Sequence, residues 1–474
     1  MFLERSPTHR LLLALLAGTT ILRLGLGWFY FGFLTGDDVE ILEAGFRVLG
    51  LRYTPWAIRN TLISDLLIGP VLRIAHSVGI SDVRTLVWIA AWPFVLFATL
   101  NIYLLFLLVR RWSNRESTAL CAAALYGLHW IPLGFGSMTY PRLVSTTCVL
   151  AAALLVSSTR QIPLRELLAG ALIALAFGFR YSEAIFLAPV AGLAASSRES
   201  WRARGISLLR VAGGFVLGVL LVAGAYESLT WGRPFAALVA FARYTLIDRQ
   251  SSSLVVQQPA YWYLWRLPHW CCLAVLPLLW ISVRRRQLLR AWLFVVLPLM
   301  ALSYIHHKEL RYLQGVLPFV CALAGAGAVT LWESGWRRAT AALLILTAGW
   351  GLARLDFLED KSMPAVMAAR ELAGDASVRT FAGVQLWRYG DRLYFGNERI
   401  VRDIPYPTSP AGVERLAAGA DAVGLYSEDL ALDERLKTIL DRLGFCDWRE
   451  FSFRGSKAVR VFRPCARTPT GVAL

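Results

Sequence analysis

The chain has 474 residues, of which 57% are hydrophobic and only 17% are charged. A soluble domain carries roughly 25% charged residues, so the composition excludes an ordinary soluble enzyme. Lys and Arg together number 49 against 32 Asp and Glu, which gives a formal net charge of +17. In a membrane protein such an excess is typical of arginine in cytoplasmic loops and of contacts with anionic lipids, so we expect a lipid bilayer and no nucleic acid as partner.

Apolar stretches along the chain predict a mainly α fold, a polytopic transmembrane helical bundle of about 11 spans. The first stretch follows a basic N-terminus, but it is too long for a signal-peptide core and lacks a small-residue cleavage site, so we interpret it as a membrane helix. The predicted spans are 11–33, 83–109, 117–135, 143–157, 164–177, 183–195, 206–225, 269–283, 288–304, 313–332 and 339–352.

Arginine in every second loop predicts the orientation of these spans. Basic residues in short loops mark the cytoplasmic side of a membrane protein. The arginines concerned are Arg5, Arg10, Arg110, Arg111, Arg115, Arg160, Arg165, Arg198, Arg202, Arg204, Arg284, Arg285, Arg286, Arg290, Arg337 and Arg338. We therefore expect a cytoplasmic N-terminus and an extracytoplasmic C-terminus, in a bacterial inner or plasma membrane.

Hydropathy falls after residue 355, which predicts a transmembrane domain over 1–355 and a small extracytoplasmic α/β domain over 356–474. In the second domain the patterns predict strands at 378–384, 422–426 and 458–462 and helices at 364–372 and 432–443. Cys446 and Cys465 flank a predicted hairpin of 451–453 with 458–462. Outside the cytoplasm they can form a disulfide or stay reduced, and both alternatives are open. Cysteine spacing indicates no zinc site.

Four carboxylates gather at the start of the first outer loop, at Asp37, Asp38, Glu40 and Glu43. One interpretation is a solvated helix start, in which Asp37 caps the helix and its neighbours face the positive end of the helix dipole. The other is a general base, or a carboxylate that orients an acceptor hydroxyl. The two interpretations are compatible, because a helix start can hold a base in place.

A second polar cluster joins two spans at the outer surface. It contains His306, His307, Lys308, Glu309 and Arg311. Histidine, lysine and arginine together favour a phosphate or pyrophosphate group. The alternative is a charged turn that reaches the membrane interface. A metal is disfavoured, since adjacent histidines point in different directions and the cations repel it.

Other candidate residues lie at the outer ends of spans and in the long outer loop. Arg142 and Arg180 are either further phosphate ligands or interfacial anchors. Trp231, Tyr261 and Trp262 belong to aromatic segments that fit a membrane-interface belt or a platform for a sugar ring or a prenyl chain.

These motifs, in this order, resemble the GT-C superfamily of membrane glycosyltransferases, and most closely glycosyltransferase family 22, the polyprenyl- or dolichyl-phosphate-mannose mannosyltransferases. His307–Tyr312 resembles the family's His-Lys-Glu-x-Arg-Phe motif, and residues 36–38 with Glu43 resemble its Pro-Asp-Glu motif and the following Glu. Here Asp38 replaces that Glu and the spacing to Glu43 is one residue shorter, which leaves both Asp37 and Asp38 as candidates for the base. The remaining similar segments are 56–59, 227–234 and 261–268, and the resemblance covers about 11–352.

The resemblance implies an enzyme that moves a sugar, mannose first, from a polyprenyl-phosphate-sugar donor to an extracytoplasmic glycan, lipid or protein acceptor with inversion. It implies no metal and no cofactor other than that donor. Asp37 or Asp38 then acts as base, and His306, His307, Lys308 and Arg311 bind the donor phosphate. The supporting residues are Glu43, Arg59, Glu309, Arg142 and Arg180.

Three other functions fit parts of the sequence. A GT-C enzyme can use another lipid-linked sugar, such as arabinose, galacturonate or aminoarabinose. A transporter or export subunit for lipid-linked saccharides predicts ionisable residues deep inside several spans, and Arg23 and Arg210 are the exceptions in spans otherwise nearly free of them. A scaffold whose outer domain binds a partner leaves both polar clusters unexplained.

Overall fold

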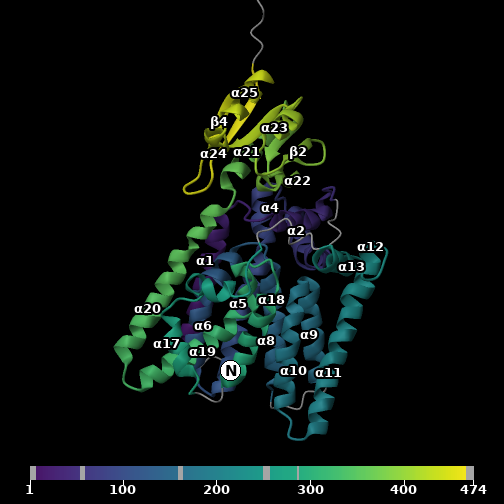
Figure 1. Ribbon diagram of the computed structural model, residues 1–474. Coiled ribbons are helices and arrows are strands. Elements are labelled where there is room, and N and C mark those ends of the chain that lie inside the picture. Colours follow the sequence, from purple (N-terminus) through teal and green to yellow (C-terminus); the bar gives the residue numbers. More distant parts are fainter. Residues whose placement is uncertain (1–6, 54–58, 159–163, 249–256, 285–287, 466–474) are drawn as a thin grey trace, which may run out of the picture. The chain divides into compact units, whose positions relative to one another are not determined.

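The computed structural model describes residues 7–53, 59–158, 164–248, 257–284 and 288–465 (Figure 1). The chain forms two compact units. The first comprises Met1–Leu26, Pro55–Ile63 and Ala91–Leu355, and the second comprises Gly27–Thr54, Ser64–Ala90 and Asp356–Leu474. The segment with the predicted acidic motif thus belongs to the same unit as the C-terminal part of the chain.

The first unit is helical. Its helices are α1 (Pro7–Phe29, whose last residues belong to the second unit), α5 (Trp92–Ser113), α6 (Glu116–Gly127), α7 (Trp130–Gly134), η3 (Phe135–Ser137), α8 (Pro141–Val156), α9 (Arg165–Phe179), η4 (Tyr181–Phe186), α10 (Leu187–Ser196), α11 (Trp201–Val219), η5 (Leu220–Ala225), α12 (Tyr226–Trp231), α13 (Ala236–Ala242), η6 (Arg243–Ile247), α15 (Trp262–Trp265), α16 (Leu267–Trp270), α17 (Val275–Ser282), α18 (Leu289–Tyr304), η8 (Leu310–Gly315), α19 (Leu317–Glu333) and α20 (Arg337–Ala353).

Small residues bring α9 and α11 into backbone contact. A Cβ atom on Gly170 would lie 2.0 Å from the carbonyl oxygen of Val211, and one on Gly214 would lie 1.9 Å from that of Leu167. Such close approach is how helices associate in a bilayer, where no hydrophobic effect drives them together. Figure 1 shows these two helices side by side.

Among the described residues, four helices are long and apolar enough to cross a membrane, or five if one bent pair counts as a single span. They are Pro7–Phe29, Val83–Ser113, Trp201–Trp231 and Arg337–Asp360, and the bent pair is Glu116–Gly127 with Trp130–Ser137. Four further apolar helices have 10–17 residues. These helices fit a membrane protein, while the span count of about 11 and the outer location of the C-terminal domain stay predictions.

The structure differs from the predicted span at 117–135, which is bent by 63°. α6 ends at Gly127, and α7 starts anew with His129 as its N-cap. The Nδ1 atom of His129 accepts a hydrogen bond from the backbone N–H of Ile131 at 3.2 Å. A cap of this kind provides a partner for one of the free N–H groups at a helix start. Hydropathy alone does not reveal such a start.

The second unit contains a five-stranded sheet in the order β2-β1-β3-β5-β4. β1 pairs parallel with β2 and β3, whereas β5 pairs antiparallel with β3 and β4. The strands are β1 (Thr380–Val384), β2 (Ile400–Ile404), β3 (Ala422–Tyr426), β4 (Phe445–Phe451) and β5 (Val459–Pro464). The predicted strands at 378–384, 422–426 and 458–462 are confirmed to within two residues at each end.

The sequence does not predict β2. The predicted hairpin is present as the antiparallel pair of β4 and β5, but its first strand covers Phe445–Phe451 and not 451–453. Both β2 and β4 carry charged residues in their interiors, half-buried or exposed in β2 and exposed in β4, so neither shows hydrophobic alternation. The remaining elements of this unit are α2 (Gly36–Phe46), η1 (Arg47–Leu49), η2 (Ser64–Ile68), α3 (Gly69–Ser77), α4 (Val83–Ala90), η9 (Arg354–Asp360, which starts in the first unit), α21 (Met363–Gly374), η10 (Leu386–Tyr389), α22 (Arg392–Phe395), α23 (Pro410–Ala417), α24 (Ser427–Leu432) and α25 (Glu434–Arg442).

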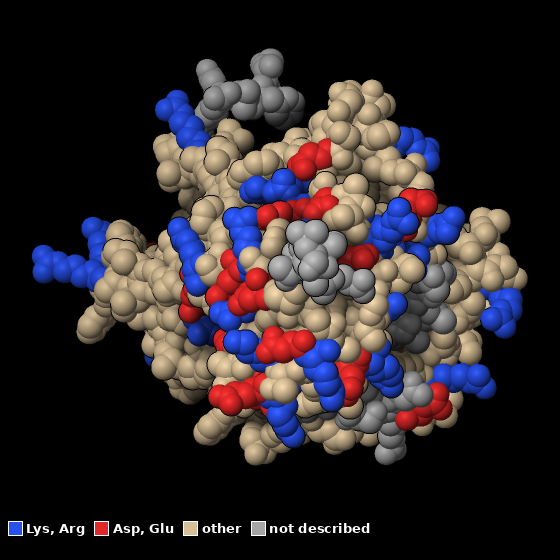
Figure 2. All heavy atoms as spheres, turned by 90° about the horizontal axis from the view of Figure 1, so that it is seen from above, with Lys and Arg blue, Asp and Glu red and all other residues tan. Residues whose placement is uncertain are grey.

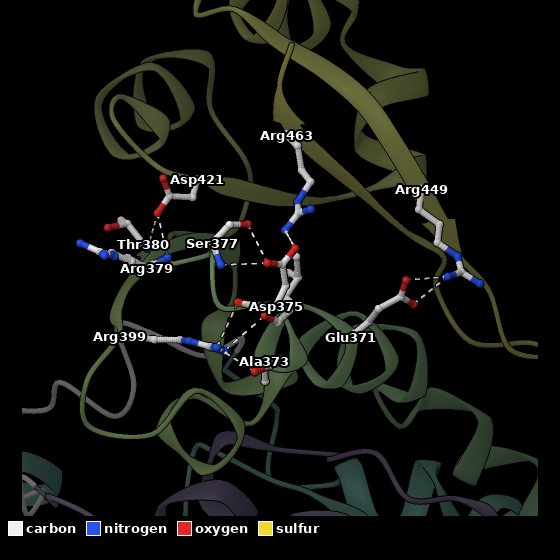
Figure 3. Close-up of polar contacts among 11 residues, drawn as sticks. Glu371, Ala373, Asp375, Ser377, Arg379, Thr380, Arg399, Asp421, Arg449 and Arg463 are labelled. Atoms are coloured by element: carbon white, nitrogen blue, oxygen red, sulfur yellow. Dashed lines mark hydrogen bonds and ion pairs between the residues drawn. The ribbon is translucent and has the colours of Figure 1, made fainter. Parts of the chain in front are cut away.

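A polar network fixes the turn from α21 into β1 (Figure 3). Arg399 donates hydrogen bonds to the carbonyl oxygens of Leu372, Ala373 and Asp375 at 3.2, 2.7 and 3.1 Å. Because the last carbonyls of a helix have no partners within it, this guanidinium caps α21. The Asp375 carboxylate in turn accepts from Arg463, at 2.6 Å, and so connects the same turn to β5.

Many charged side chains on the C-terminal part of the chain form ion pairs. Figure 2 shows acidic and basic side chains interspersed on the face that it views. Exposed pairs include Arg449–Glu371 at 2.6 Å, Arg442–Glu414 at 2.5 Å and Lys457–Glu428 at 3.0 Å. Pairs of this kind contribute little stability but keep a surface solvated. On the face that Figure 2 views, the described basic side chains therefore lie among acidic ones and form no extended basic patch.

Cys446 and Cys465 form a disulfide. It joins β4 to the residue after β5 and closes a loop of 19 residues in sequence separation. A disulfide that closes a loop of about 15–20 residues lowers the conformational entropy of the unfolded chain, which stabilises the folded protein by roughly 3 kcal/mol. We expect the double variant Cys446→Ser with Cys465→Ser to unfold at lower temperature than the oxidised protein. Unfolding of reduced wild type provides the control, and an unchanged transition in both would contradict this prediction.

Candidate functional site

Helix α2 holds the two aspartates of the acidic motif in different environments. The Oδ2 atom of Asp38 accepts hydrogen bonds from the backbone N–H groups of Leu34 and Thr35, both at 3.1 Å. Asp38 is 5% exposed, whereas Asp37 is half-buried in the first turn of the helix. The side chain of Asp38 therefore folds back to fix the helix start, as in a capping box.

A buried lysine lies behind this helix start. The ammonium of Lys361 donates to the carbonyl oxygen of Tyr30 at 2.5 Å, and Ser362 exchanges backbone and side-chain hydrogen bonds with Phe33. Burial lowers the pKa of Lys361 to about 8, although the negative charge of Asp38 opposes this shift. Asp38 thus supplies counter-charge to a buried cation and satisfies two N–H groups, which are structural tasks.

Glu43 lies two turns further along α2 and docks this helix on α22. Its Oε1 atom accepts the backbone N–H of Arg392 at 3.0 Å. Burial, reinforced by the negative charge of Asp391, raises the pKa of Glu43 to about 8. The end of the same segment is held by Asn397, which accepts from the N–H of Arg52 and donates to the carbonyl of Gly50.

The raised pKa of Glu43 predicts a pH-dependent stability. Between pH 4.5 and about 8 the folded chain keeps a proton that the unfolded chain has lost, so the free energy of unfolding falls as pH rises. The full loss is at most about 5 kcal/mol, from 1.36 kcal/mol per pKa unit. We expect Glu43→Gln, which still accepts from Arg392, to remove this slope. Thermal unfolding from pH 5 to 9 measures it, and parallel slopes in both proteins would refute the assignment.

In the first unit, Glu309 is the centre of the loop between α18 and α19. His307 lies 2.9 Å from one oxygen of its carboxylate, and the Nε of Arg311 donates to the other. Burial alone would favour the neutral acid, but the hydrogen bonds and charges of His307 and Arg311 hold the pKa of Glu309 at about 2. Lys308 is 5% exposed and donates to the carbonyl oxygens of Gln258 and Ile305.

A buried ion pair adjoins this loop. Arg142 pairs with Glu183 and donates to the Ser182 hydroxyl at 3.0 Å, and the paired side chains of Arg142 and Glu183 are 3% and 1% exposed. The guanidinium of Arg142 lies 4.4 Å from the centroid of the Tyr312 ring. Arg180 interacts electrostatically with Glu183 and Tyr312 as well. We call Arg142, Arg180, His307, Lys308 and Arg311 the basic cluster.

The structure brings Arg142 and Arg180 together with the motif loop. The predicted acids Asp37, Asp38 and Glu43 belong to the second unit, whereas the basic cluster belongs to the first. His306 is exposed, and its carbonyl accepts the backbone N–H of Gln258 at 3.0 Å. Arg59 is half-buried in the first unit, while its motif partner Trp56 lies outside the described residues.

The predicted aromatic platform divides over two segments. Trp231 ends α12, whereas Tyr261 and Trp262 lie at the start of α15, with Tyr261 63% exposed. Trp262 contacts Tyr263 edge-on with ring centroids 5.1 Å apart. Tyr263 donates its hydroxyl to the carbonyl oxygen of Glu309 at 3.3 Å and so connects this segment to the motif loop.

Sequence reasoning missed the partners of the basic cluster. Glu183 is the buried counter-ion of Arg142, and Tyr140 donates its hydroxyl to the carbonyl oxygen of Arg311 at 2.7 Å. The available signal for Glu183 was an acid within a predicted apolar span, where ionisable side chains are rare and functional. For Tyr140 and Tyr263 the sequence carries no signal, because both act through a backbone carbonyl far along the chain.

Comparison with solved structures identifies the fold. The chain is similar to ArnT from Cupriavidus metallidurans in the apo state (12% identity, TM-score 0.60, 94% of this chain and 97% of that chain covered) and bound to undecaprenyl phosphate (13%, 0.58, the same coverage). It is also similar to the apo oligosaccharyltransferase of Archaeoglobus fulgidus (11%, 0.53, 94% and 74%). At this level of identity the likeness shows that the chain shares the fold of these proteins.

The family follows from the sequence profile. The Alg9-like mannosyltransferase family, glycosyltransferase family 22, matches residues 53–373, which is more than half of the chain. The protein therefore belongs to this family, as its motifs predict. No curated protein matches the chain in sequence.

Proposed function

We propose that the protein transfers mannose from a polyprenyl-phosphate-mannose donor to an extracytoplasmic acceptor with inversion, at a bacterial inner membrane. The family supports the mannosyl group, and one neighbour's bound undecaprenyl phosphate supports a polyprenyl carrier. The observation that carries the proposal is the charge balance around the motif loop. Arg142 and Arg180 interact with the carboxylate of Glu183, and Arg311 pairs with that of Glu309. Lys308, which donates to backbone carbonyl oxygens, is the fourth cation of the basic cluster, so its Lys and Arg side chains outnumber these two carboxylates by two.

That excess suits the leaving group. Attack by an acceptor hydroxyl on the anomeric carbon forms the new glycosidic bond and breaks the bond to the phosphate oxygen, so the polyprenyl phosphate gains one negative charge. Cations fixed before the reaction stabilise such developing charge most effectively. Since phosphate is already a good leaving group, we propose that no general acid, metal or further cofactor takes part.

Asp37 is the proposed base. The hydroxyl that attacks must lose a proton as the bond forms, and a carboxylate within hydrogen-bonding reach accepts it. Asp38 is occupied by the backbone of Leu34 and Thr35 and by the charge of Lys361. Asp37 is the less buried of the two and stands in the first turn of the same helix.

The test is release of polyprenyl phosphate by purified protein in lipid, with a panel of polyprenyl-phospho-sugars and a glycolipid extract as acceptor. We expect release with the mannose donor, a product of opposite anomeric configuration, and at least a tenfold loss in Arg311→Ala. Arg338→Ala, which removes an exposed arginine at the start of α20, is the matched control. Release of polyprenyl phosphate from a donor with another sugar would correct the identity of the sugar and leave the mechanism unchanged. No release from any donor by folded protein would refute the proposal that the protein is this enzyme.

A further inference from the structure

We propose that the carboxyl edge of the sheet in the C-terminal part of the chain binds the acceptor as a saccharide, on a cluster formed by Gln385, Trp387, Arg388, Tyr406 and Tyr426. We call these residues the edge cluster. The inference deepens the proposed function and rests on it for the statement that the saccharide is the acceptor.

The place of the cluster in the fold is the first argument. In the sheet order β2-β1-β3, strand β1 lies between β2 and β3. The chain runs from β1 to its neighbour on one side, β2, and then crosses to its neighbour on the other side, β3. The carboxyl ends of β1 and β3 therefore flank a topological switch point, where open parallel sheets bind their ligands. Gln385 directly follows β1, and Tyr426 is the last residue of β3.

Hydrogen bonds and ring contacts assemble these side chains. The Oε1 atom of Gln385 accepts from the Tyr426 hydroxyl at 3.1 Å and from the Nε of Arg388 at 3.0 Å. The Arg388 guanidinium lies 4.7 Å from the ring centroid of Trp387 and 5.9 Å from that of Tyr426. Tyr406 adds a ring that is 49% exposed and edge-on to Tyr426.

The chemistry of the cluster favours a saccharide over a nucleotide. The exposed ring of Tyr406 and the half-buried indole of Trp387 can cover the apolar face of a sugar ring, while guanidinium and amide groups bond its hydroxyls. Tyr426 is 2% exposed and supports the cluster through its hydrogen bond to Gln385. Where such a sheet binds a nucleotide phosphate at its switch point, a glycine-rich turn typically leads from the strand into the start of a long helix. Here β1 is followed by Gln385, with φ of 51°, and by the four-residue turn η10. Asp403, whose carboxylate accepts the N–H of Leu386 at 2.7 Å, adds negative charge at this edge instead.

The cluster also contacts the start of the helix that carries the proposed base. A Cβ atom on Gly36 would be 3.6 Å from the Cγ of Trp387, so this indole is in contact with the first residue of α2. Asp37 is the next residue. A saccharide on the edge cluster is therefore held beside the carboxylate that must receive its proton, which gives the C-terminal domain a direct part in the reaction.

The test uses the full-length protein in nanodiscs, with saturation-transfer NMR of mannobioses, cellobiose and maltotriose as probes. We expect signal from at least one probe, lost in Trp387→Ala and in Arg388→Ala and weakened in Tyr406→Ala. Trp448→Ala is the matched control, because Arg463 lies over that indole at the same 4.7 Å, on strands β4 and β5. Signal from no probe, or equal loss in Trp387→Ala and Trp448→Ala, would overturn the proposal.

Kinetics separate binding from damage to α2. In Arg388→Ala, whose side chain bonds Gln385 rather than α2, we expect the acceptor KM to rise at least tenfold with a much smaller change in kcat. A fall in kcat with constant acceptor KM would contradict the assignment. The protein could bind a saccharide in a manner that depends on Trp387 and yet turn over no donor. That result would support the binding site and refute the proposed transfer reaction.

Discussion

Asp37→Asn is expected to lower the rate of sugar transfer at least about 100-fold with little change in the donor KM, because a positioned general base contributes about 10²–10⁴. Asparagine preserves the size of the side chain and the first turn of α2 but cannot take the proton. Transfer to the acceptor and thermal unfolding, measured on the same preparation, separate lost chemistry from lost folding.

Asp38→Asn is the control for that result, since the two aspartates are neighbours with different contacts. It weakens the hydrogen bonds to Leu34 and Thr35 and leaves Lys361 without its negative neighbour. We expect a lower unfolding temperature, in line with a cap worth about 1 kcal/mol, and a kcat that stays well above that of Asp37→Asn. The reverse ranking of the two kcat values would make Asp38 the base.

Much of the C-terminal fold can be predicted from the sequence, for an identifiable reason. β1 and β3 are buried throughout and have mainly apolar sequences, and the buried positions of β5 are apolar residues between arginines. β2 and β4 carry charged side chains in their interiors and give no such signal. Hydropathy also predicts a single boundary near residue 355. It cannot show that residues 27–54 and 64–90 join the C-terminal part in one unit, because that depends on contacts such as Glu43 with Arg392.

The candidate site is likewise predictable where it depends on residues that are neighbours in the sequence, and not where it depends on contacts between distant segments. The motif at 307–312 and the acids of α2 are contiguous in sequence, so their chemistry is visible there. The different roles proposed for Asp37 and Asp38 rest on the hydrogen bonds that the Asp38 carboxylate accepts, which the sequence does not reveal. The edge cluster unites residues from the ends of β1, β2 and β3, and its aromatic and polar side chains acquire a common meaning only once the strand order is known.

Arg142→Ala is expected to cost the protein both stability and donor binding. The Arg142–Glu183 pair is buried, and removal of one partner leaves the other as an uncompensated charge, at a typical cost of about 3–5 kcal/mol. The Tyr312 ring loses its guanidinium neighbour at the same time. We expect a lower unfolding temperature, and a loss of polyprenyl-phosphate binding that persists under conditions where the variant is folded.

The double variant Arg142→Met with Glu183→Leu separates these two effects. Apolar side chains of similar volume in place of a buried ion pair are often neutral or stabilising, so the unfolding temperature should return toward that of wild type. If Arg142 belongs to the phosphate site, the double variant still binds polyprenyl phosphate weakly although its stability is restored. A double variant that is stable and binds like wild type would mean that the pair only supports the bundle, and that Arg311, Lys308 and Arg180 hold the phosphate without it.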